Sequence, residues 1–184
     1  MNLTRYRVPS ALLKSEPDPV TRKEERTHGD GVYDALLSQA GAFDRNQIVL
    51  AASTVGVTEV LSMNLADEAR ERFESMIRRS NFQTIALSDG IARHAARLRR
   101  HCYGKEKNGA GEPYMLTTPD SIHVVSAMLI KADVLVTLDS ENKPVKVDRR
   151  EMAMTKVASH YPVPDLHPVA ISRPGLGLPG TGLL

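Results

Sequence analysis

Short apolar runs alternate with helical patterns along most of the chain, and this alternation constrains the fold more than any other feature. The run "QIVLAAS" (47–53) has the length and composition of a strand covered on both faces, and "FQTIALS" (82–88) and "ADVLVTLD" (132–139) are predicted as further strands. Amphipathic helical patterns separate them, including "ADEARERFESMIRRS" (66–80) and "SDGIARHAARLRRHC" (88–102). Strands joined through helices form right-handed crossovers between parallel neighbours. The sequence therefore predicts an α/β fold, a three-layer α/β/α sandwich with a mainly parallel sheet.

Local signals set several element boundaries. Leu3 to Val8 has the composition of a first strand, and a helix that begins at Val32 can end at Gly41. Thr118 is expected to cap the helix "PDSIHVVSAMLIK", with Pro119 at its first helical position. Residues 54–65 fit either a helix or irregular structure.

The 184 residues are enough for one core, so we expect a single α/β domain over 1–150 and an extension over 151–184. The extension contains a late strand at Pro168 to Ser172 and then a Gly/Pro-rich tail. The net charge of +2 does not by itself predict a nucleic-acid or membrane partner. A single cysteine, Cys102, excludes an internal disulfide and is typical of a cytoplasmic protein. No apolar stretch approaches the ~18 residues of a membrane span.

Three acidic residues are expected to meet at one edge of the sheet. Asp139 directly follows Val134 to Leu138, and ligands collect at the carboxyl ends of parallel strands. Asp120 lies in the first turn of the preceding helix, which begins at the same edge. Glu59 follows the strand 47–52 within the apolar "VGVTEVLS", where a carboxylate is costly to bury unless it is paired or binds a metal. Clustered carboxylates suit a hard cation, Mg²⁺ or Mn²⁺.

These motifs resemble the PIN-domain family, which includes the toxin ribonucleases of VapBC-type toxin–antitoxin pairs. The resemblance rests on "TEVLS", on "TPDSIHVVSAMLIKADVLVTLDS" and more loosely on "LSDGIARHAARLR". It implies a PIN-like domain that acts as a metal-dependent ribonuclease, in which Glu59, Asp120 and Asp139 hold Mg²⁺ or Mn²⁺ for cleavage of RNA. It also implies a supporting hydroxyl at Thr137, an antitoxin protein as partner and a homodimer.

The first strand departs from the family pattern. "YRVPSALLK" is similar to a motif in which an aspartate and a small residue precede "SALL", but Val8 and Pro9 occupy those positions. Ser10 follows them and is a supporting candidate. Valine cannot bind a cation, and two aspartates that could replace the missing ligand, Asp30 and Asp34, lie farther along the chain. The resemblance therefore implies weak or absent cleavage, and the alternative is a PIN-like module that binds RNA or protein.

Each candidate in the pocket also has a structural explanation. Asp120 can favour the N-terminal end of the helix dipole, and Asp139 can serve as a turn residue after a strand. His123 lies one turn after Asp120 and either approaches the pocket or is a structural helix residue.

The basic run "RHAARLRRHCYGKEK" offers phosphate contacts through Arg93, Arg97 and Arg100, or it is a solvated helix face. Aromatic residues make up 4% of the chain, which argues against a base-stacking platform. A phosphatase or phosphotransferase is a weaker hypothesis, because no Asp-x-Asp nucleophile motif is present.

Overall fold

The structure is a computed structural model that describes residues 4–6, 30–139 and 149–175. The helices and strands follow the alternation that the sequence predicts. Along the chain they are β1 (Thr4–Tyr6), α2 (Asp30–Asp44), β2 (Ile48–Ser53), α3 (Thr54–Leu61), α4 (Asp67–Ile77), β3 (Phe82–Ile85), α5 (Asp89–Cys102), α6 (Thr118–Leu129), β4 (Val134–Val136), the 3-10 helix η2 (Met154–His160) and β5 (Ala170–Ser172).

Every pairing among the described strands is parallel. β2 lies between β1 and β3, with Leu50 opposite both Tyr6 and Phe82, and β4 pairs with β5. Contacts between β1 and β4 place the two groups of strands side by side. β5 confirms the late strand expected near the end of the chain. The predicted mainly parallel sheet is therefore confirmed.

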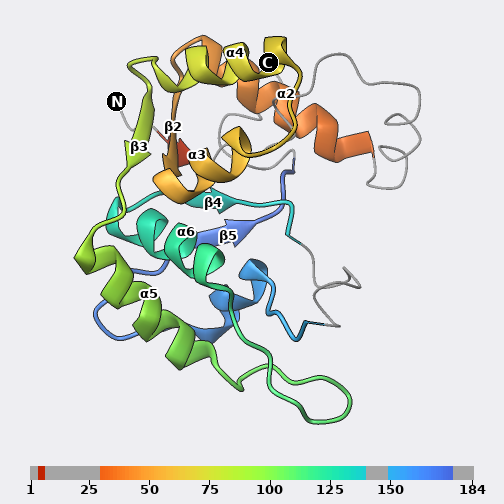
Figure 1. The fold of residues 1–184 in the computed structure, drawn as a ribbon, viewed down its shortest axis with the longest axis vertical. Coiled ribbons are helices and arrows are strands. Elements are labelled where there is room, and N and C mark those ends of the chain that lie inside the picture. The colour runs from red at the N-terminus through yellow and green to blue at the C-terminus, as the bar shows by residue number, and fades with distance from the viewer. Residues whose placement is uncertain (1–3, 7–29, 140–148, 176–184) are drawn as a thin grey trace.

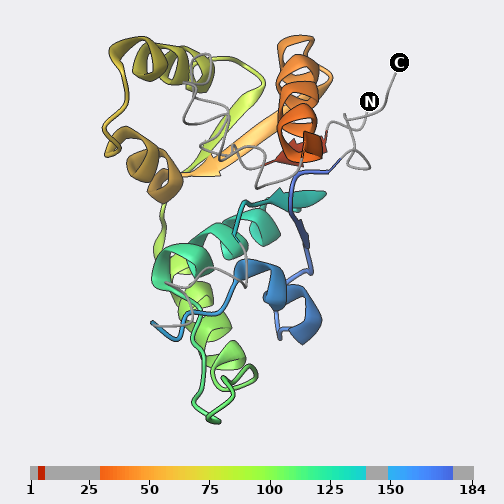
Figure 2. The same cartoon turned by 90° about the vertical axis from the view of Figure 1, so that its right-hand side faces the viewer.

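Helices cover both faces of the strands. Leu135 of β4 packs in a core cluster with α5, α6 and η2, whereas its neighbours Val134 and Val136 pack with Phe43 of α2. Successive side chains of a strand point to opposite faces, so β4 lies between two helical layers. Figures 1 and 2 show this arrangement, with α2, α3 and α4 beyond one side of β4 and α5, α6 and η2 beyond the other. The α/β/α layering is confirmed.

The end of α2 differs from the prediction, and the structure decides between the two alternatives for residues 54–65. α2 continues through Gly41 to Asp44, because Ala42 and Phe43 are buried and extend its packing face. The left-handed conformation typical of a helix end falls on Asn46, which has φ 56°. Residues 54–65, which fit either a helix or irregular structure by sequence, begin with the helix α3.

The cap of α6 is Thr117, not Thr118. The Thr117 hydroxyl accepts a hydrogen bond from the backbone N–H of Asp120 at 3.2 Å, and its extended backbone (φ −66°, ψ 160°) suits a cap. Every residue from Ser121 to Met128 is buried, so α6 is enclosed by the rest of the fold. α6 is apolar but has only 12 residues. No helix in the described part of the chain is long and apolar enough to cross a bilayer.

The segment after residue 150 contributes to the same core. Met152, Met154, Val157, Val163 and Val169 belong to the cluster around α6. The division into 1–150 and 151–184 stays a prediction, and residues 176–184 of the expected tail lie outside the described residues.

Candidate active site

Two of the predicted acidic residues are carried by helices that begin beside the strands. α3 starts immediately after β2, and its cap Ser53 accepts the N–H of Gly56. Glu59 follows within α3, and its side chain is 46% exposed. Asp120 occupies the first turn of α6 and is half-buried. Both carboxylates therefore remain accessible from solvent.

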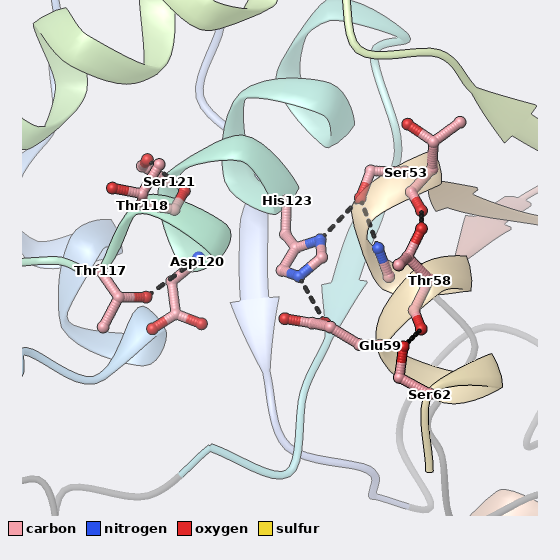
Figure 3. A network of polar contacts seen from close by, with 11 residues as sticks. Ser53, Thr58, Glu59, Ser62, Thr117, Thr118, Asp120, Ser121 and His123 are labelled. Carbon is pink, nitrogen blue, oxygen red and sulfur yellow. Dashed lines mark hydrogen bonds and ion pairs between the residues drawn. The ribbon is translucent and has the colours of Figure 1, made fainter.

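A buried histidine connects α6 to α3. The Nε2 of His123 lies 3.1 Å from Oε2 of Glu59, and its Nδ1 lies 2.8 Å from Oγ of Ser53 (Figure 3). His123 is 3% exposed, so its ring is enclosed between the two helices. The histidine thus contacts one of the predicted acidic residues, Glu59, from within the core.

Asp139 is buried and hydrogen-bonded to the backbone. Its Oδ2 accepts the N–H of Met154, the first residue of η2, at 2.8 Å. Its own N–H donates to Oγ1 of Thr137 at 3.0 Å. Thr137 therefore shapes the turn after β4, and Asp139 fixes the start of η2. A hydrogen bond of this kind also orients a carboxylate that binds a metal.

The carboxylates of the candidate site have the chemistry that a hard divalent cation requires, but they do not form a group of three ligands. Figure 3 shows the carboxylates of Glu59 and Asp120 on the same side of the first turn of α6. Carboxylate oxygens are the ligands that Mg²⁺ and Mn²⁺ prefer. Within residues 4–6, 30–139 and 149–175, no three Asp, Glu, His or Cys side chains form a group that could hold a metal ion. Val8 and Ser10 lie outside these residues, and Asp34 is exposed on α2.

Comparison with known proteins decides the family. The family model described as "PIN domain" matches residues 25–147. The chain belongs to the PIN domain family. Glu59, Asp120 and Asp139 lie within the matched residues, whereas Val8 and Ser10 precede them.

This PIN domain is similar to a chain in the crystal structure of VapBC2 from Rickettsia felis, which is bound to a DNA fragment from the VapBC2 promoter. The two chains share 15% identity over 92% of this chain and 98% of that chain, with a TM-score of 0.45. No curated protein matches this chain.

The arginines expected to bind RNA lie on the exposed face of α5. Arg93 pairs with Asp89 at 2.7 Å, and Arg97 pairs with Asp165 at 3.1 Å. Arg100 is exposed, and among the described residues it has no carboxylate within ion-pair distance. These exposed pairs are weak, so they leave the arginines available to phosphates.

Sequence reasoning missed Ser53 as a site residue of this PIN domain. The signal was present, because a serine between a strand and a helical pattern is a preferred N-cap. Its contact with His123 gave no such signal, since the two residues are far apart in sequence.

Proposed function

We propose that this PIN domain is a cytoplasmic endoribonuclease that requires Mg²⁺ or Mn²⁺, with Glu59, Asp120 and Asp139 as the metal ligands. The observation that carries the proposal is the placement of the Glu59 and Asp120 carboxylates on one side of α6, from two helices distant in sequence (Figure 3). PIN domains are generally nucleases that depend on divalent metals, which supports this assignment.

The residues of the chain would orient the metal and the RNA. Asp120 is presented by the capped first turn of α6, and Asp139 is oriented by the N–H of Met154. A divalent cation bound there supplies Lewis-acid activation of the phosphodiester and of a water nucleophile. Arg97 and Arg100 would contact phosphates of single-stranded or structured RNA, which adds affinity without sequence information.

We infer that cleavage is weak, because Val8 stands where the related motif has its first aspartate. Losing one anionic ligand lowers the attraction for a divalent cation and leaves the ion less well oriented. The test measures Mn²⁺ binding and cleavage of single-stranded RNA for the natural chain and for Val8→Asp. The control adds Asp120→Ala to each of the two forms. We expect Val8→Asp to raise both metal affinity and cleavage. Robust cleavage that survives Asp120→Ala would overturn the carboxylate mechanism.

A specific observation favours a second candidate, a catalytically impaired PIN module that binds RNA or protein. No three metal-binding side chains are grouped among the described residues, and Asp139 already serves η2. If Val8→Asp gains no cleavage while the natural chain still binds RNA, the binding module is the better description.

We also propose an antitoxin protein as partner and a homodimer as the form of the free chain, on the resemblance of "TEVLS" and "TPDSIHVVSAMLIK" to VapBC toxins. Co-expression with the product of the adjacent reading frame tests the first, since a bound antitoxin should suppress RNA cleavage. Light scattering of the purified chain tests the second.

A further inference from the structure

His123 is an enclosed polar side chain beside the candidate site. Its two ring nitrogens contact Ser53 and Glu59. Gly56 allows the ring to approach α3 closely, because a Cβ on Gly56 would lie 3.3 Å from Cε1 of His123. The serine caps α3, and the glycine and the glutamate lie within it, so this one helix holds the ring from three directions.

The partners of the ring define its tautomer. A carboxylate only accepts hydrogen bonds, so Nε2 of His123 carries the proton and donates to Glu59. In a neutral imidazole Nδ1 is then an acceptor, and it takes the hydroxyl proton of Ser53. The Ser53 oxygen in turn accepts the N–H of Gly56 at 3.1 Å. This assignment, inferred from the partners, gives each of these groups a compatible role.

These three hydrogen bonds form a relay in which each group donates to the next. Gly56 N–H donates to Ser53, the Ser53 hydroxyl donates to His123, and His123 donates to Glu59. Glu59 is a long and partly exposed side chain, and a fixed donor restricts the positions of its carboxylate. His123 also follows Asp120 by one helical turn, so the two side chains share a face of α6. α6 therefore carries one carboxylate, Asp120, and contacts a second, Glu59, through its histidine (Figure 3).

We propose that His123, held at Nδ1 by Ser53 and at Nε2 by Glu59, is a positioning residue that aims the Glu59 carboxylate toward the site of Asp120. This inference rests on the proposed function in one respect, namely that Glu59 and Asp120 bind the same metal ion. Partners that orient metal-binding carboxylates typically change metal affinity about 10–100-fold when they are removed.

The first experiment measures Mn²⁺ affinity of the full chain by electron paramagnetic resonance, with thermal unfolding to verify folding. We expect His123→Leu to weaken binding about 10–100-fold and His123→Gln, which retains an N–H donor, to restore most of it. The control is Ser126→Ala on α6, because the buried Ser126 hydroxyl has no hydrogen-bond partner in the described residues. Folded His123→Leu that binds Mn²⁺ like the natural chain would overturn the proposal.

The second experiment does not depend on the metal. A long-range ¹H–¹⁵N spectrum of the natural chain should show His123 protonated at Nε2 and unprotonated at Nδ1. A His123 ring that mixes the two tautomers, or is protonated at Nδ1, contradicts the relay. If the natural chain and Asp120→Asn show the same lack of Mn²⁺ binding, the proposed metal site is wrong, whereas a tautomer that does not fit the Glu59 contact contradicts the positioning role independently of the metal.

Discussion

α5 and α6 have similar residues at their N-termini, but the aspartates there have different surroundings. Each helix has a hydroxyl cap, Ser88 or Thr117, and an aspartate in its first turn. Asp89 of α5 pairs with Arg93 of its own helix, and both side chains are more than three-quarters exposed. α6 contains no lysine or arginine, and beside its aspartate lies a histidine that contacts Glu59 of α3.

The difference shows that a capped aspartate does not make a site. An acidic residue at a helix N-terminus is stabilised by the helix dipole wherever it occurs. Asp120 is a candidate ligand because α6 packs against β2 and α3, and Glu59 of α3 lies on the same side of the first turn of α6 (Figure 3). α5 packs on α6, one layer farther from the sheet (Figure 2).

The largest expected effect is a loss of stability when the core cluster that α5 and α6 share is disrupted. Leu98 of α5 and Met128 of α6 are fully buried in the same cluster, so Leu98→Ala and Met128→Ala should each lower the free energy of unfolding by about 2–5 kcal/mol. Leu129→Ala, at a side chain that is 46% exposed, should cost about 0.5 kcal/mol. Urea denaturation measures all three. A loss at Leu98 as small as that at Leu129 would show that α5 is peripheral to the core.

The next effect separates the two helices. Asp120→Asn should lower Mn²⁺ affinity by at least about tenfold, because it removes the charge of a proposed ligand. Asp89→Asn makes the same change in the first turn of α5 and should leave the affinity unchanged. Calorimetric titration provides the measurement. Equal losses in the two variants would mean that Mn²⁺ responds to overall charge and not to a site on α6.

A smaller effect is expected on the exposed face of α5. The double variant Arg97→Glu and Arg100→Glu should weaken RNA binding and flatten its dependence on salt, by about one unit of slope for each phosphate that is no longer neutralised. Arg72→Glu on the exposed face of α4 is the control for local charge reversal. RNA binding across a salt series is the measurement, and an unchanged slope would make α5 an ordinary solvated helix.

The smallest effect concerns the buried face of α5. Burial raises the pKa of the Cys102 thiol from 9.0 to about 11, despite an opposing effect of Lys105. The folded chain therefore keeps this proton while the unfolded chain releases it, so stability should decline as pH rises from about 9 to about 11. Denaturation midpoints at about pH 8 and about pH 10.5, compared with Cys102→Ala, test this. Rapid alkylation of the folded chain at the lower pH would contradict the burial of the thiol.

Much of the fold followed from local pattern. Alternating apolar runs and amphipathic helices predicted the parallel layers, because side-chain period and strand length are properties of short segments. Boundaries were less certain. Gly41 lies within α2 because Ala42 and Phe43 find partners on β2 and β3, and such partners are distant in sequence.

The sequence by itself determined the family, the layers, and the positions of Asp120 and Asp139 relative to their own helix and strand, and it placed Glu59 after the strand 47–52. Only the tertiary structure decided that His123 faces Glu59 and Ser53, and that Asp139 binds the backbone of Met154. The physical reason is that caps and periodicities act within one or two helical turns. Contacts between α6 and α3 depend instead on how two helices pack, which no local pattern encodes.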